Sequence, residues 1–175
     1  MATPRIVSLI ASATEIVAGL GFGKHLIGRS HECDFPPELV AKLPVLTAPR
    51  FATDGSSAEI DRRVKDLVKD GLSVYRVDRE LLRALAPDVI VTQAQCEVCA
   101  VSLAEVEAAV AGWVGQTVKI LSCEPNRLED VWRDVAMVAN GLGAPARGSA
   151  LVGRLKARID TRAIAEEEKN LGWQT

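Results

Sequence analysis

The sequence predicts an α/β fold, a three-layer flavodoxin/Rossmann-like lobe in which helices cover a parallel sheet, followed by a long α-helix. First, short apolar runs alternate with amphipathic segments, which is typical of strand, helix, strand repeats with right-handed crossovers. Second, the run at residues 6–10 is apolar at nearly every position, as in a parallel strand covered on both faces. Third, apolar residues recur at helical spacing over about six turns after residue 144. We expect the flavodoxin-like strand order.

The first strand and helix span residues 5–21. The helix is expected to begin at Ser12, because Ser12 and Glu15 have the spacing of a reciprocal N-terminal cap. The GLGFG run at residues 19–23 follows a helix rather than a strand, so we interpret it as a helix end and not as a nucleotide-binding loop.

The later elements follow the same pattern. A second strand is expected at residues 25–30, and its polar loop is closed by Pro36 and Pro37. Brief strands are expected at residues 45–47 and 74–77, and clearer ones at 88–92 and 117–121. Helices are expected to begin at Ser56 with Glu59, at Asp78, at Ser102 with Glu105, and at Asn126 with Glu129.

Composition limits the classes of function. The chain has 175 residues, 48% of them hydrophobic, and a net charge of -2, so no basic surplus indicates a nucleic-acid partner. No apolar run approaches the roughly 20 residues that a membrane helix needs. The first strand begins close to Met1, so we expect a cytoplasmic protein from the sequence as written, or a periplasmic one if a leader was removed.

Four polar loops are expected at one edge of the sheet, because parallel strands end at the same edge. They are residues 8–12, 30–37, 92–102 and 122–126. In open α/β sheets, ligands bind at this edge. No GxSxG, HExxH or Walker sequence is present, so we expect a binding protein rather than an enzyme.

Two of these loops carry possible metal ligands. His31 and Cys33 form an HxC pair, and Cys96 and Cys99 form a CxxC pair. Imidazole and thiolates suit zinc, and four of them make a closed tetrahedral site. Alternatively, Cys96 and Cys99 form a redox pair, or all four residues pack the loops without metal. These alternatives stay open.

Several segments together resemble a known family. They are residues 5–21 (RIVSLIASATEIVAGLG), 28–37 (GRSHECDFPP), 84–96 (ALAPDVIVTQAQC) and the long helix after Gly143. They resemble the helix-linked periplasmic binding proteins that capture cobalamin and ferric siderophores for import by ABC transporters, and most closely the cobalamin-binding branch. The resemblance implies two α/β lobes joined by one helix. This chain would then supply one lobe (residues 1–143) and the connecting helix with a frayed C-terminus (144–175), without the second lobe.

The resemblance also implies a ligand and its site. A corrinoid or another small metal chelate would lie at the carboxyl edge of the sheet, with no cofactor required. The residues expected to hold it are Ser12, His31, Glu32, Phe35, Gln93 and Gln95. His31 is a candidate ligand of the cobalt. The sequence differs from the cobalamin binders where it has His31, Glu32 and Cys33 in place of aromatic residues.

Two surfaces are expected to meet partner proteins. Glu80 falls where the family carries an acid that docks onto an ABC permease, although it is equally an acid favoured in a helix's first turn. On the long helix, Leu151, Leu155 and Ile159 share one face. This face is expected either to pack on the first lobe or to form a homodimer.

Overall fold

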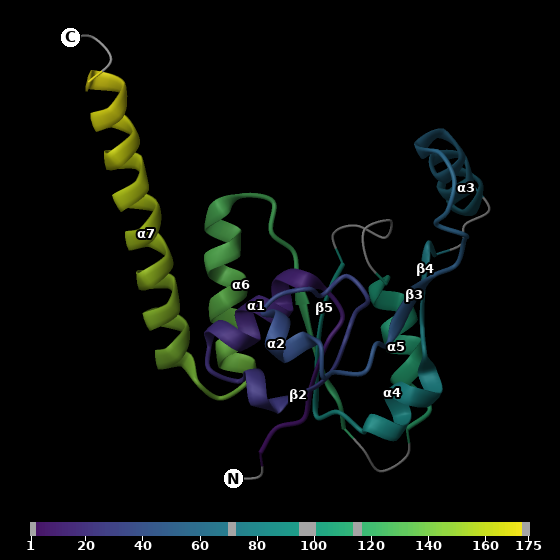
Figure 1. Ribbon diagram of the computed structural model, residues 1–175. Helices are drawn as coiled ribbons and strands as arrows, with labels where there is room; N and C mark the ends of the chain where they lie inside the picture. Colours follow the sequence, from purple (N-terminus) through teal and green to yellow (C-terminus); the bar gives the residue numbers. More distant parts are fainter. Residues whose placement is uncertain (1–2, 70–72, 95–100, 114–116, 173–175) are drawn as a thin grey trace.

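A four-stranded parallel sheet forms the centre of the molecule (Figure 1). The computed structural model describes residues 3–69, 73–94, 101–113 and 117–172. The strands are β1 (Ile6–Ser8), β2 (Leu26–Arg29), β5 (Val89–Gln93) and β6 (Lys119–Cys123). Their order is β2-β1-β5-β6, and each neighbouring pair is parallel. This is the flavodoxin-like order, with β1 beside the switch point, so the predicted fold class is confirmed.

Helices cover both faces of this sheet. The helices α1 (Ala11–Gly19) and α6 (Leu128–Gly141) pack on one face, and α4 (Arg79–Leu85) and α5 (Leu103–Val110) pack on the other. Successive side chains of a strand point to opposite faces. Val89 and Val91 therefore join the core under α1 and α6, whereas Ile90 joins the core under α4 and α5. These cores hold the three layers together.

A two-stranded sheet with a helix at its far end forms what we call the arm. Its strands β3 (Thr47–Pro49) and β4 (Tyr75–Val77) pair antiparallel. Between them lies α3 (Ser57–Lys69), which projects away from the lobe in Figure 1. The strand predicted at residues 74–77 matches β4, whereas β3 begins two residues later than the strand predicted at 45–47. The parallel pairing that we expected throughout is wrong here. A parallel crossover needs a connecting helix that covers the sheet, and α3 buries none of its residues.

The arm is anchored to the main sheet through the segment that precedes β3. Arg29 and Val45 form an isolated parallel bridge. The backbone nitrogen of Leu46 donates to the oxygen of Arg29 at 2.8 Å, and the nitrogen of Asp78 donates to the oxygen of Leu46 at 2.8 Å. The Leu46 side chain is completely buried. The base of the arm is thus part of the core, whereas α3 is not.

Most helices begin where the capping residues predicted. Ser56 and Glu59 form the reciprocal cap of α3, with the Ser56 nitrogen donating to Oε2 of Glu59 at 2.7 Å. Oδ1 of Asp78 accepts from the nitrogen of Leu81 at 2.9 Å at the start of α4. Oγ of Ser102 accepts from the nitrogen of Glu105 at 3.3 Å at the start of α5. The predicted starts of these three helices are therefore confirmed, and each start depends on residues three apart.

Three local predictions are wrong. The helix α1 begins at Ala11, one residue before Ser12, which lies exposed inside its first turn. The helix α6 begins at Leu128, because the Asp130 carboxylate accepts from the nitrogens of Asn126 and Arg127, and the predicted pair Asn126 and Glu129 does not set its start. His25 lies in a 3-10 turn, η1 (Gly23–His25), before β2 rather than in the strand. A short helix, α2 (Pro37–Val40), follows the loop after β2.

The helix α7 (Pro145–Gly172) packs its N-terminal part on the lobe. Leu151 is buried in the core under α1 and α6, Leu155 is half-buried against it, and Ile159 is 44% exposed. The Arg147 guanidinium lies 4.9 Å above the centre of the Phe22 ring. The first half of the predicted apolar face thus covers the lobe. The helix continues to Gly172, and Figure 1 shows this part extending beyond the lobe.

The contact of α7 with α6 depends on a glycine. A Cβ atom at Gly148 would lie 2.6 Å from the Cβ of Ala139, whereas one at Gly153 would meet no atom within 4 Å. We expect Gly148→Ala to lower the free energy of unfolding by about 1–3 kcal/mol, because the two helices must separate. The matched control, Gly153→Ala, should raise it by about 0.5–1 kcal/mol through better helix propensity. Urea unfolding measures both, and equal effects of the two substitutions would contradict the close packing.

Candidate ligand-binding site

The loops after β1 and β2 meet at the carboxyl edge of the sheet, as predicted. The Thr14 hydroxyl, on α1, lies 2.9 Å from Oγ of Ser8 and 3.0 Å from Sγ of Cys33. All three residues are buried. Oγ of Ser8 also donates to the oxygen of Ile10 at 3.0 Å, which fixes the turn into α1. The loop that carries His31 and Glu32 is therefore held against the start of α1.

Thr47, the first residue of β3, holds the imidazole of His31. Its hydroxyl oxygen lies 2.7 Å from Nδ1 of His31 and accepts from the His31 backbone nitrogen at 3.0 Å. It also lies 2.9 Å from Oγ of Ser30. Ser30 and Thr47 are each 4% exposed, so this hydroxyl pair is shielded from water. The ring of His31 is thereby oriented with Nδ1 toward the protein and Nε2 away from it.

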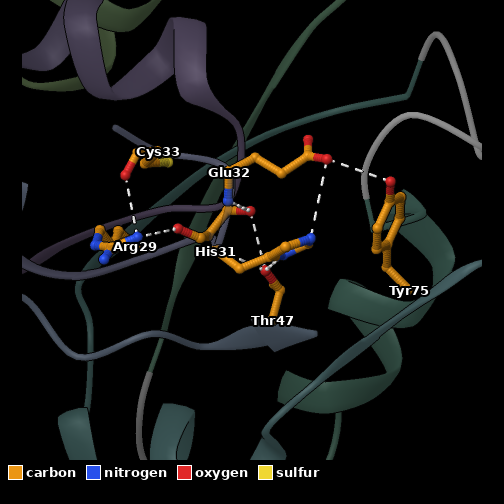
Figure 2. Close-up of polar contacts among 7 residues, drawn as sticks. Arg29, His31, Glu32, Cys33, Thr47 and Tyr75 are labelled. Carbon is orange, nitrogen blue, oxygen red and sulfur yellow. Dashed lines mark hydrogen bonds and ion pairs between the residues drawn. The ribbon is translucent and has the colours of Figure 1, made fainter. Parts of the chain in front are cut away.

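Glu32 and Tyr75 lie beside the other nitrogen of His31 (Figure 2). The Nε2 atom of His31 is 3.9 Å from Oε1 of Glu32, and the Tyr75 hydroxyl donates to the same oxygen at 3.3 Å. The rings of His31 and Tyr75 are tilted, with centroids 5.1 Å apart. Burial and the neighbouring Glu32 carboxylate raise the pKa of Tyr75, so the phenol keeps its proton. Three groups with metal-binding or hydrogen-bonding capacity thus converge at this edge.

The side chain of Arg29 holds the loop that follows β2. Its guanidinium donates to the backbone oxygens of Ser30 at 2.9 Å, Cys33 at 3.0 Å and Val40 at 2.9 Å. Figure 2 shows Arg29 beneath this loop, on the side away from Tyr75. These charge-assisted hydrogen bonds hold the loop closed over the end of β2.

An ion pair fixes β4, the strand that carries Tyr75. Nη2 of Arg50 lies 2.7 Å from Oε1 of Glu105, which also accepts from the nitrogen of Val77 at 3.4 Å. Nε of Arg50 donates to the oxygen of Tyr75 at 3.1 Å. The Glu105 side chain is only 10% exposed. The predicted return of Glu105 to Ser102 is not seen; its carboxylate instead connects α5 to the arm.

The structure describes five of the six residues that we predicted to contact a ligand. His31 and Glu32 are brought together at the carboxyl edge. Ser12 is exposed on α1, Phe35 is 55% exposed, and Gln93 is 7% exposed at the end of β5. Gln95 lies outside the described residues. Glu80 is exposed in the first turn of α4, and its docking on a permease stays a prediction.

The predicted zinc ligands are only partly described. Cys96 and Cys99 lie outside the described residues, so their pairing with His31 and Cys33 stays a prediction. In the part of the chain that the structure describes, no three His, Cys, Asp or Glu side chains are grouped to hold a metal. Cys33 contacts Thr14, whereas the His31 ring contacts Thr47. Burial raises the pKa of the Cys33 thiol, which disfavours the thiolate that zinc requires.

Three residues of the site were not predicted from the sequence: Thr14, Thr47 and Tyr75. Thr14 is two residues from the expected Ser12. Tyr75 is the only tyrosine of the chain and lies in a predicted strand. No local pattern showed that this strand would pair antiparallel with β3 and bring Tyr75 to His31.

A small cavity lies on the arm near this cluster. It has a volume of about 170 Å³ and is lined by Val45, Leu46, Thr47, Ala48, Arg76 and Asp78. Ligand pockets for drug-sized molecules are roughly 300–1,000 Å³. A corrinoid is larger still, so this cavity cannot enclose a ligand of that size.

Comparison with solved structures identifies the fold. No family model matches the sequence, and no curated protein matches it. The periplasmic heme-binding protein RhuT from Roseiflexus sp. RS-1 is 23% identical over 91% of this chain and 49% of its own, with a TM-score of 0.62. A periplasmic heme-binding protein from Pseudomonas aeruginosa is 24% identical over 95% of this chain and 49% of its own, with a TM-score of 0.61. The vitamin B12-binding protein BtuF of Vibrio cholerae is 17% identical over 90% and 49%, with a TM-score of 0.61.

The likeness is one of fold. The predicted resemblance to periplasmic substrate-binding proteins of ABC importers is confirmed at that level. This chain spans about half the length of the solved structures that it matches. All three are described as periplasmic, so they give no support to the expected cytoplasmic location. Among the described residues, no helix combines the length and the hydropathy of a membrane span.

Thiol reactivity tests the environment of the two described cysteines. Cys33 and Cys123 are each 2% exposed, and burial with the nearby carboxylates of Asp134 and Glu124 raises the pKa of Cys123 to about 12. At mildly alkaline pH, iodoacetamide should label neither residue in the native protein, because the thiolate is the reactive form. Both should react after unfolding in urea, which is the internal control in the peptide mass spectra. Rapid native labelling of either one would contradict its burial.

Proposed function

We propose that this chain is a non-catalytic ligand-binding lobe that holds a small metal chelate, as part of the substrate-binding component of an ABC importer. The observation that carries this proposal is the convergence of His31, Glu32 and Tyr75 at the carboxyl edge. Neighbours of the same fold are described as binding heme or vitamin B12. The edge of a parallel sheet is also where ligands of open α/β proteins bind.

We propose a corrinoid as the first ligand to test, as the sequence resemblance implies. The contact residues would be Ser12, His31, Glu32, Phe35, Gln93 and Gln95. The exposed ring of Phe35 offers an apolar surface, and Nε2 of His31 points away from its Thr47 anchor. A neutral imidazole held in this way can bind an axial position of cobalt. No cofactor is required beyond the ligand.

One lobe alone should bind such a ligand weakly. A corrinoid that touches a single face gains fewer contacts, and these must still offset the entropy lost on binding. We propose that a second lobe or a second chain completes the site, either beside α7 or through a homodimer in which Ile159 is covered. Glu80 is proposed to dock on the permease, and a periplasmic location would suit that role.

The alternative function is a metal-site or thiol-redox protein that uses His31, Cys33, Cys96 and Cys99. The presence of an HxC and a CxxC pair in two loops that the sequence predicts at the same edge supports it, whereas the burial that raises the pKa of the Cys33 thiol argues against it. Native mass spectrometry separates the two functions. The alternative requires about one zinc per chain, lost when Cys96 and Cys99 are replaced by serine, or thiol reactivity near neutral pH.

Visible-light titration with hydroxocobalamin tests the binding function. We expect a saturable spectral shift in the full chain, and His31→Ala should weaken binding by at least about tenfold because it removes the axial ligand. His25→Ala is the matched control, since His25 is the only other histidine and lies before β2, at the opposite edge. The proposal fails if neither hydroxocobalamin nor hemin gives a saturable shift.

A further inference from the structure

The helix α3 carries an apolar face that the lobe does not cover. Ile60, Val64 and Leu67 share this face at helical spacing, and Val68 beside them is 49% exposed. No residue of α3 is buried. Isolated helices shorter than about 12–15 residues are marginal in water, and packing of an amphipathic face supplies most of the stability of a helix in a protein. The apolar face of this 13-residue helix therefore indicates a surface that covers it.

A groove between α6 and α7 is apolar in the same way. Trp132, Leu155, Arg158 and Ile159 line it, and its volume is about 310 Å³. Ile159 is 44% exposed. From Leu155 to its end at Gly172, α7 runs for about 25 Å. The 13 residues of α3 span about 20 Å, so α3 can lie along this part of α7.

Most charged residues beside the apolar face of α3 are held by the arm itself. Nζ of Lys65 lies 2.6 Å from Oδ2 of Asp61. Glu59 caps the start of the helix, and the guanidinium of Arg63 donates to two backbone oxygens of the preceding loop at 2.6 Å. Asp66, at the border of the same face, is exposed and forms no ion pair with another described residue. An acid is thus left there for a partner.

Cations border the groove on α7. Arg158 lines it, is exposed and forms no ion pair with a described carboxylate. Nζ of Lys156 lies 5.9 Å from the centre of the Trp132 ring. Asp160 lies about 120° around α7 from the centre of its apolar face. Packing α3 in this groove joins an unpaired acid to an unpaired cation, whereas pairing two copies of either surface brings like charges together.

The two surfaces lie where a second copy of the chain can join them. In Figure 1, α3 and the far part of α7 project on opposite sides of the lobe, and both extend past the carboxyl edge of the sheet. Rotating a second copy by 180° in the plane of that view brings its α3 toward the first α7, and its α7 toward the first α3. We propose that two copies form a symmetric dimer in which α3 of each packs in the groove of Trp132, Leu155 and Ile159 on the other. Each contact then occurs twice.

This inference deepens the proposed function, in which a second chain completes the ligand site. In such a dimer the two carboxyl edges face each other, so the second copy covers the open side of His31 and Glu32. The pairing itself needs no ligand and is measured without one.

Sedimentation velocity of the full chain at increasing concentration tests the dimer. We expect the dimer fraction to rise with concentration. Leu67→Asp and Ile159→Asp should each raise the dissociation constant at least about tenfold, because each buries a carboxylate against apolar side chains. Neither residue is buried, so both variants should keep the circular dichroism spectrum of the unaltered chain. The matched controls, Ala58→Asp and Ala157→Asp, place the same charge on the opposite faces of α3 and α7 and should dimerise normally.

Charge reversal identifies which surfaces meet. Asp66→Arg and Arg158→Asp should each weaken the dimer, because each places like charges at the contact. An equimolar mixture of the two variants should form a mixed dimer, since one contact then has its original charges and the other has both charges exchanged. Pairing of α3 with α3, or of α7 with α7, predicts no such rescue.

Three results would overturn the inference: a chain that stays monomeric at every concentration, a dimer that only one of Leu67→Asp and Ile159→Asp weakens, or no rescue in the mixture. Hydroxocobalamin titration of the same samples separates this inference from the proposed function. If the chain is monomeric and still gives a saturable shift, only this inference fails. If it dimerises and neither hydroxocobalamin nor hemin binds, only the proposed function fails.

Discussion

The common direction of β1, β2, β5 and β6 is the constraint on which the candidate site depends. Parallel strands joined by helices deliver every carboxyl end to one edge. The loop after β2 therefore reaches the start of α1, where Thr14 contacts Cys33. If β2 ran the other way, His31 and Glu32 would lie at the opposite edge, far from α1 and α5. Polar contacts refine this placement, but strand direction determines it.

The arm adds two residues to the candidate site, Thr47 and Tyr75, that the parallel sheet does not carry. Thr47 directly follows Leu46, whose backbone nitrogen bonds to β2. The Thr47 hydroxyl contacts both the backbone nitrogen and the ring of His31. In the antiparallel register, Thr47 lies opposite Val77 and Pro49 opposite Tyr75. The return strand thus brings a phenol to the loop that carries the imidazole and the carboxylate. The ion pair of Arg50 and Glu105 then fixes this strand against α5.

The sequence predicts what local patterns determine. Apolar runs and capping pairs predicted the strands, most helix starts and the parallel order, and His31 and Glu32 were predicted because they directly follow a strand. Two kinds of information were missing. The side chains of Ser12 and Thr14 point about 200° apart around α1, and only the packing of α1 on the sheet determines that Thr14 is buried and Ser12 exposed. The pairing of β3 with β4 depends on residues that are far apart in sequence. No pattern around Tyr75 therefore predicted that its ring would lie beside His31.

The open edge offers a ligand little surface to bury against. The side chains of His31 and Glu32 are 26% and 45% exposed, and Phe35 is 55% exposed, so one side of this edge faces solvent. A ligand that touches a single face gains fewer contacts to offset the entropy lost on binding. The hydroxyl of Thr47 lies 2.7 Å from Nδ1 of His31, so the ring is already held in place. A ligand at this edge would therefore depend more on directed polar contacts than on buried area.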